Sequence, residues 1–229
     1  AEAPNDTDLD ATIGLHGSFR DDKIPRGARH RPLYDAVNPY TRADAVLLAL
    51  DPAKGQSGAA LLRPDGQQTK LVTSAVVTKQ AERETFVAGA KELAVKLNLP
   101  LIIVAEAWDP PRGSGATRVD KRWNFPTILG MGEGWGRWTA ELERFDVPEL
   151  DIVRATPNVW RDALYGKRRE QDSKKLKAVA VQYVEQRLKV TLPHDAAEAV
   201  CLGLWGLHSM DVLRRAEVWF TKNRRKTLG

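Results

Sequence analysis

Residues 46–66 read VLLALDPAKGQSGAALLRPDG. They begin with an unbroken apolar run that ends in Asp51, and a run without alternation is typical of a central strand that is buried on both faces. A turn containing Pro and Gly separates this run from a second predicted strand, 58–63. A Pro-Asp-Gly turn then leads to a third strand, 71–77. An antiparallel meander therefore begins the predicted domain.

The hydrophobic period changes after the meander. Apolar residues recur at helical spacing over 80–97, and a second wholly apolar strand, 101–106, ends in Glu106. A strand, a helix and a strand in this order predict a crossover between parallel strands. Farther along, the sequence predicts a helix over 135–145, a short strand over 150–153, a basic helix over 173–188 and a last helix over 194–210. The predicted fold class is α/β, with a mixed five-stranded sheet, an antiparallel meander followed by parallel strands, flanked by helices.

Length and composition fit one sizeable domain with extensions. The chain has 229 residues, 42% hydrophobic and 28% charged, which is ordinary for a globular protein and excludes wholesale disorder. We expect an irregular arm over 1–43, a folded domain over 44–212 and a basic tail over 213–229. The single cysteine, Cys201, cannot form an internal disulfide, and no apolar run has the length of a membrane span. These features predict a cytoplasmic protein without a membrane partner.

The distribution of charge indicates a nucleic-acid partner. The chain carries 35 Lys and Arg against 30 Asp and Glu, a net charge of +5, and many of the basic residues are clustered. Such clusters attract a phosphate backbone, although they could also form a solvated face. The predicted phosphate-binding residues between 167 and 177 are Lys167, Arg168, Arg169, Lys174, Lys175 and Lys177.

A predicted loop over 107–127 combines aromatic and basic residues. A long segment without regular structure is often functional. Trp108, Arg122 and Trp123 are predicted to contact DNA, with the indoles stacked on unpaired bases, because every base has a π-face. Packing inside the protein is the alternative role of these tryptophans.

Four carboxylates are candidates for the chemistry. Asp51 and Glu106 each end a strand, and Asp195 and Glu198 lie three residues apart on one face of the last helix. Taken singly, Asp51 could be a turn residue and Asp195 a first-turn acid. Together the four could meet at the carboxyl edge of the sheet, where they would repel one another without a cation. Hard divalent ions prefer oxygen ligands, so the set predicts two Mg²⁺ ions, with Mn²⁺ as a substitute, and the hydrolysis of phosphodiesters.

Several short motifs resemble the RuvC family of Holliday-junction resolvases, within the RNase H-like superfamily. The resemblance covers about 45–210 and is carried by Asp51-Pro52 with Ser57-Gly58, by Glu106, by the segment 156–166 and by His194-Asp195-Ala196-Ala197-Glu198-Ala199. It implies an RNase H-like fold in which Asp51, Glu106, Asp195 and Glu198 are metal ligands and catalytic residues. Glu198 stands where the family commonly has an aspartate. His194 could assist catalysis, or it could be a capping or solvent-facing residue.

The resemblance implies a Mg²⁺-dependent endodeoxyribonuclease that resolves four-way DNA junctions by paired symmetric nicks in a bacterial or phage-infected cell. Two symmetric nicks need two active sites, so we expect a homodimer, with 80–97 or 173–188 as candidate interface. The alternatives are an exonuclease of the same superfamily, a terminase or transposase nuclease domain, and a non-catalytic junction-binding protein. Such exonucleases usually carry Asp-x-Glu on the first strand, whereas Asp51 is followed by Pro52 and Ala53.

Overall fold

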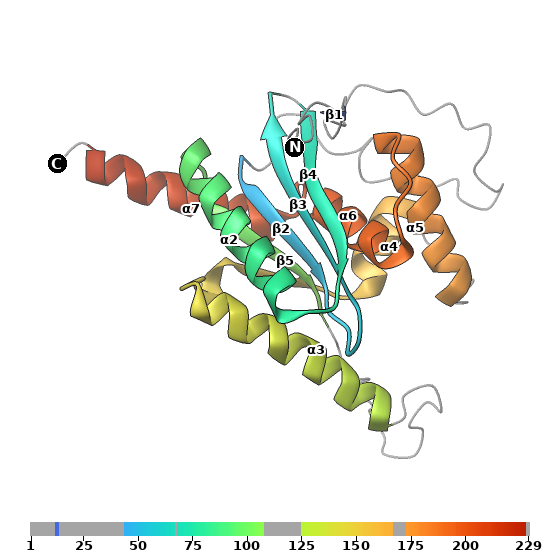
Figure 1. The fold of residues 1–229 in the computed structure, drawn as a ribbon. Helices are drawn as coiled ribbons and strands as arrows, with labels where there is room; N and C mark the ends of the chain where they lie inside the picture. The colour runs from blue at the N-terminus through green and yellow to red at the C-terminus, as the bar shows by residue number, and fades with distance from the viewer. Residues whose placement is uncertain (1–11, 14–43, 67, 108–124, 167–172, 228–229) are drawn as a thin grey trace, which may run out of the picture.

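The sheet at the centre of the molecule combines antiparallel and parallel strands (Figure 1). The computed structural model describes residues 12–13, 44–66, 68–107, 125–166 and 173–227. The five main strands are β2 (Val46–Asp51), β3 (Ser57–Asp65), β4 (Gln68–Val77), β5 (Leu101–Glu106) and β6 (Ile152–Ala155). β2, β3 and β4 pair antiparallel, and β5 and β6 continue the sheet in parallel on the other side of β2. This order, β4-β3-β2-β5-β6, confirms the predicted mixed sheet of an RNase H-like fold.

A sixth, very short strand lies at the edge of the sheet. β1 (Thr12–Ile13) pairs antiparallel with β4, with Thr12 opposite Lys70. The sequence predicted an irregular arm over 1–43, and a strand of two residues is too short to give a periodic signal. An edge strand leaves backbone N–H and C=O groups that another segment can pair with, which accounts for this addition. The rest of the predicted arm lies outside the described residues.

Helices cover both faces of the sheet (Figure 1). α2 (Gln80–Leu97) and α3 (Phe125–Arg144) lie over one face, and α6 (His194–Gly206) lies over the other, with α4 (Pro157–Tyr165) and α5 (Ser173–Leu188) packed beside it. Leu48 and Leu50 join the core on the side of α2 and α3, whereas Leu47 and Ala49 join the core under α6. Residues 46–50 are fully buried, so β2 is the predicted central strand with two buried faces.

Small residues allow α6 to lie very close to the sheet. A Cβ atom on Gly203 would overlap the side chain of Leu62, and a Cβ atom on Gly58 of β3 would overlap the backbone carbonyl of Asp195. Gly58 is also the residue that pairs with Asp51 across β2 and β3. The absence of a side chain at Gly58 therefore brings the first turn of α6 directly beside the end of β2.

α3 begins earlier than the sequence indicated. A helix was predicted over 135–145 after a group of glycines, but α3 begins at Phe125 and contains those glycines. A Cβ atom on Gly134 would lie 2.5 Å from the backbone of Ala53, so glycine permits the helix to cross the turn that follows Asp51. The guanidinium of Arg137 also donates to the carbonyl of Lys54 at 2.8 Å. Gly134 therefore reflects a close helix contact rather than a loop.

The C-terminal half contains further differences. The helix predicted over 194–210 ends at Gly206, and a separate helix, α7 (Met210–Thr227), occupies most of the predicted basic tail. α4 was not predicted, although a proline in its first turn is a recognised start signal. A short 3₁₀ helix, η2 (Glu149–Asp151), precedes β6. Among the described residues, no helix combines the length and the apolar character that a membrane span needs.

Candidate active site

Two of the four predicted acids come from neighbouring strands. Asp51 ends β2 and Glu106 ends β5, and these strands run parallel, with Leu50 opposite Ala105. Parallel strands present their carboxyl ends at the same edge of a sheet, so the two carboxylates lie side by side there. The turn after Asp51 is held by Ser57, whose hydroxyl accepts a hydrogen bond from the N–H of Ala53 at 3.2 Å. The main chain at Asp51 is therefore constrained on both sides.

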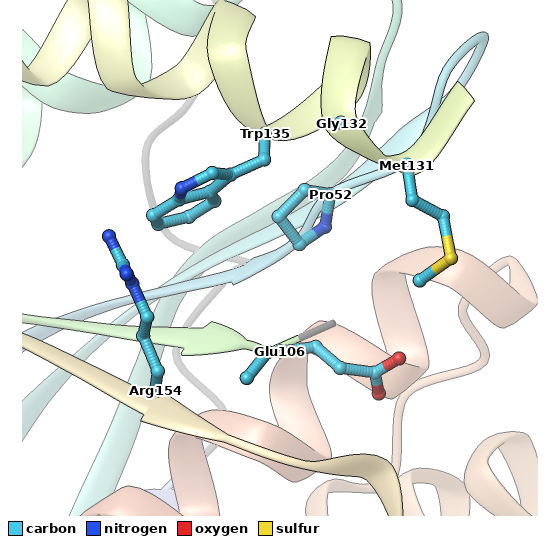
Figure 2. A pocket seen from close by; sticks show the side chains of 7 residues that line it. Pro52, Glu106, Met131, Gly132, Trp135 and Arg154 are labelled. Atoms are coloured by element: carbon cyan, nitrogen blue, oxygen red, sulfur yellow. The ribbon is translucent and has the colours of Figure 1, made fainter. Parts of the chain in front are cut away.

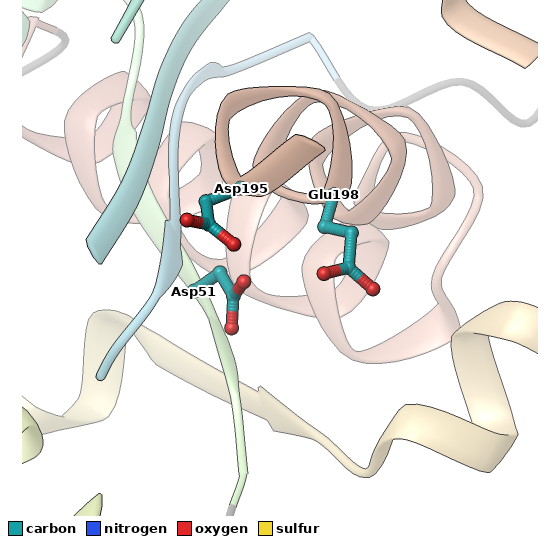
Figure 3. Close-up of side chains that lie close together, drawn as sticks. All are labelled: Asp51, Asp195 and Glu198. Carbon is teal, nitrogen blue, oxygen red and sulfur yellow. The ribbon is translucent and has the colours of Figure 1, made fainter. Parts of the chain in front are cut away.

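The first turn of α6 supplies the other two acids. Asp195 and Glu198 are both buried, and they lie on the face of α6 that is turned to β2. Carboxylate oxygens of Asp51, Asp195 and Glu198 all lie within 4.8 Å of one another. Figure 3 shows the three side chains directed into the same space from β2 and from α6. The prediction that these acids converge at the edge of the sheet is confirmed for these three.

The environment of Asp51 disfavours a negative charge. Burial raises its pKa well above the ordinary value, and the charges of Glu106, Glu198 and Asp195 raise it further, while Arg161 opposes them. A cation among these oxygens would remove the repulsion. The donors are all carboxylate oxygens, which is the ligand chemistry of Mg²⁺, Mn²⁺ and Ca²⁺ rather than of thiophilic metals. The residues present therefore fit a hard divalent ion.

Glu106 is held slightly apart from this cluster by α4. Its carboxylate accepts a hydrogen bond from the indole N–H of Trp160 at 2.9 Å and lies 3.6 Å from the guanidinium of Arg161. Burial raises the pKa of Glu106, whereas the charge of Arg161 lowers it and that of Glu198 raises it. The neighbouring cation and indole thus hold a buried acid in a fixed orientation.

Arg161 is a residue of the site that sequence reasoning did not single out. Its guanidinium donates to Glu198 at 2.6 Å and also lies over the ring of Trp160, at 4.8 Å from the ring centre. The guanidinium therefore connects acids from β5 and α6. Its position within the segment 156–166, which resembles the RuvC family, was the available signal.

Lys177 and His194 approach Asp195 from the open side of the site. The ammonium of Lys177 donates to Asp195 at 2.8 Å, and Nδ1 of His194 lies 2.6 Å from the same oxygen. Partial burial works against the charge on Lys177, but the hydrogen bond to Asp195 and the neighbouring acids raise its pKa overall. His194, which was predicted either to assist catalysis or to be a capping or solvent-facing residue, contacts a candidate ligand directly.

The other predicted DNA-binding residues fall into two groups. Lys174 and Lys175 are exposed on α5, three and two residues before Lys177. The remaining ones lie outside the described residues: Trp108, Arg122, Trp123, Lys167, Arg168 and Arg169. Their predicted roles stay predictions.

Comparison with known proteins gives likenesses in structure alone. No family model and no curated protein matches the chain. Thermus thermophilus RuvC in complex with Holliday junction substrate is similar over 71% of this chain and 92% of that one, with 16% identity and a TM-score of 0.47. The yeast mitochondrial Holliday junction resolvase is similar over 76% and 84%, with 10% identity and a TM-score of 0.39. The fowlpox virus resolvase, solved with Holliday junction DNA, is similar over 69% and 94%, with 13% identity and a TM-score of 0.35.

Proposed function

We propose that this protein is a metal-dependent endonuclease that cuts branched DNA. The observation that carries the proposal is the carboxylate cluster, in which Asp51, Asp195 and Glu198 bring oxygens within 4.8 Å of one another beside Glu106. Such a cluster, flanked by a basic helix, is suited to the hydrolysis of a phosphodiester with divalent ions. We assign it to the class of RuvC-like resolvases because the motifs around these acids resemble that family.

In this proposal Asp51, Glu106, Asp195 and Glu198 hold two Mg²⁺ ions, and Mn²⁺ can replace them. When bound, the ions lower the pKa of water and neutralise the charge that develops on the phosphate. The chain itself orients the ligands. The β2–β3 pairing and the Ser57 turn fix Asp51, and the close packing of α6 fixes Asp195 and Glu198. Because these carboxylates are buried, bulk water has little access to the oxygens that would hold the ions.

Arg161 and Lys177 supply positive charge for the substrate. Arg161 pairs with Glu198, and Lys177 pairs with Asp195. Both side chains are hydrogen-bond donors with a positive charge, so they would also be available to phosphate oxygens of DNA bound beside these carboxylates. Because its pKa is raised, Lys177 keeps its proton at neutral pH and acts as a fixed charge rather than as a base.

A four-way junction is the substrate that we propose. Its two-fold symmetry requires two nicks on opposing strands, and the described part of one chain carries one such carboxylate cluster, so we expect two copies to act together. We propose a C₂ homodimer. α2 and α5 are the candidate interface elements, and Val95 on α2 is a large apolar side chain that is 80% exposed. The exposed lysines of α5 would then hold the backbone of each arm.

The test is cleavage of a cruciform extruded from a covalently closed plasmid, with Mg²⁺ present. A dimeric resolvase should give linear DNA by paired nicks within one complex. A monomeric nicking enzyme would release nicked circles, and an exonuclease would leave the closed substrate intact. Asp51→Asn is the control for contaminating nucleases, and Ca²⁺ should support binding with little cutting.

A further inference from the structure

A cleft of about 230 Å³ lies beside Glu106, on the side of α3. Its lining residues include Pro52, Glu106, Met131, Gly132, Trp135 and Arg154. Figure 2 shows that the side chains of Trp135 and Met131 project from α3 toward Pro52 and Glu106. The carboxylate of Glu106 points away from Trp135. The cleft therefore opens next to the candidate metal ligands without being part of their cluster.

The walls of the cleft combine a flat aromatic surface with one cation. The guanidinium of Arg154 on β6 lies over the ring of Trp135, at 4.9 Å from its centre. Arg154 is also paired with Glu149 at 2.7 Å. Met131 and Pro52 add a thioether and a pyrrolidine ring. Aromatic, thioether and guanidinium groups are surfaces on which a planar ring can stack.

We propose that this cleft receives one unstacked nucleobase of the cleaved strand, next to the phosphate that is cut. The inference rests on the proposed nuclease function. A volume of about 230 Å³ suits a single ring system and excludes a double helix or a protein helix. Glu106 both lines the cleft and belongs to the acidic site, so a base in the cleft and a phosphate at the acids can belong to neighbouring nucleotides. The walls of the cleft are largely aromatic and apolar, and the guanidinium of Arg154 is already paired with Glu149, so the occupant is a base rather than backbone.

Gly132 and Gly136 allow a matched test. A Cβ atom on either would have no neighbour within 4 Å, and both lie in α3, where leucine favours the helix more than glycine does. Only Gly132 is among the residues that line the cleft. Gly132→Leu should fill the cleft without unfolding the helix, and Gly136→Leu is its control.

The experiment uses four-way junctions that carry one abasic site, placed in turn at each nucleotide around the cut. Cleavage is measured with Mg²⁺ and binding is measured with Ca²⁺. At one position the abasic site should slow wild-type cleavage and weaken binding by roughly 10-fold, the scale of one base–aromatic stack. Gly132→Leu should show the same loss on intact DNA and no further loss at that abasic site. Gly136→Leu should behave as wild type.

The two measurements, cleavage with Mg²⁺ and binding with Ca²⁺, separate this inference from the proposed function. Suppose that wild type cuts, but that every abasic site slows wild type and Gly132→Leu by the same factor. The cleft then takes no base, and the nuclease function is unaffected. Suppose instead that wild type does not cut, but that in binding the abasic position and the Gly132→Leu change are not additive. The base-binding role of the cleft is then supported, and the proposed nuclease function is rejected. A Gly132→Leu variant with normal cleavage would overturn the inference. A wild-type chain that neither binds nor cuts overturns both.

Discussion

α6 and α3 meet the same edge of the sheet from opposite faces, and they differ in the space that they leave there. Under α6, the glycines at 58 and 203 allow contact so close that a single added carbon would overlap a neighbour. Under α3, the closest approach is limited to Gly134, and the cleft between Met131 and Trp135 stays open.

In the proposed function, the α6 side and the α3 side of this edge have different roles. On the α6 side, tight packing holds carboxylates at the distance that a divalent ion needs, and burial makes their mutual repulsion strong. On the α3 side, the open cleft offers an apolar wall beside one of those acids. In the proposed nuclease, the positions of the small residues leave one side of this edge closed for chemistry and the other side open for recognition.

The largest expected effect is that of Asp51→Asn, which should lower cleavage by at least about 100-fold, since loss of a ligand charge weakens metal binding. DNA binding should survive or tighten, because the change also removes repulsion between the acids and the phosphate. Glu106→Gln, Asp195→Asn and Glu198→Gln should behave alike. Asp65→Asn, at the far end of β3, is the control. Gel assays with Mg²⁺ and with Ca²⁺ measure the two effects, and normal turnover of Asp51→Asn would remove this residue from the mechanism.

A second prediction compares the helix contacts through their glycines. Gly58→Ala should lower the free energy of unfolding by roughly 1–3 kcal/mol, because its Cβ atom overlaps the backbone of Asp195 and α6 must move. It should also impair Mg²⁺-dependent cleavage, since Asp195 moves with the helix. Gly136→Ala on α3 has open space and should stabilise by about 1 kcal/mol through helix propensity. Thermal and urea unfolding measure both, and equal effects of the two changes would contradict the contrast between tight and open sides.

A third prediction concerns pH. Burial, followed by the charges of Glu106, Glu198 and Asp195, raises the pKa of Asp51 in the folded protein. A pKa raised on folding gives stability that is complete below the unfolded value, about 4, and is lost as the pH rises through the folded value. The metal-free protein should therefore melt at lower temperature as pH rises above about 4. Mg²⁺ binding offsets this loss.

The measurement is the melting temperature of wild type and of Asp51→Asn across this pH range, with and without Mg²⁺. The stabilisation by Mg²⁺ should grow with pH in wild type, because protons no longer compete for the ligands. It should be small and nearly flat in Asp51→Asn. A wild-type Mg²⁺ effect of the same size at every pH would show that Asp51 does not couple proton and metal binding.

The sequence predicted those features that depend on local patterns. The unbroken apolar run before Asp51 predicted a strand with two buried faces, and the i, i+3 spacing of Asp195 and Glu198 predicted two acids on one helix face. Both predictions use only residues that are close to one another in the sequence.

The features that were missed depend on contacts between distant segments. Arg161 reaches Glu198 across 37 residues of sequence, and no local pattern shows that a cation will lie between these acids. The glycines of α3 indicated a loop by propensity, but the contact of Gly134 with Ala53 overrides propensity and keeps the helix. The cleft beside Glu106 is formed by residues from β5, α3, β6 and the turn after β2, so it becomes visible only once the sheet is assembled.

The smallest expected effects separate Lys177 from the exposed lysines on the α6 side. Replacing Lys174, Lys175 and Lys177 together by alanine should weaken DNA binding and reduce the salt dependence by about one unit of slope per lost phosphate contact. The double variant Lys174→Ala/Lys175→Ala should bind DNA more weakly, but its cleavage rate at saturating DNA should equal that of wild type. Lys177→Ala should also slow cleavage at saturation, because Lys177 donates to Asp195 at 2.8 Å and holds its charge beside the cut phosphate. Lys222→Ala, exposed on α7, is the control. An unchanged slope in the triple variant would mean that these lysines form only a solvated face, and unchanged saturated cleavage in Lys177→Ala would confine that residue to binding.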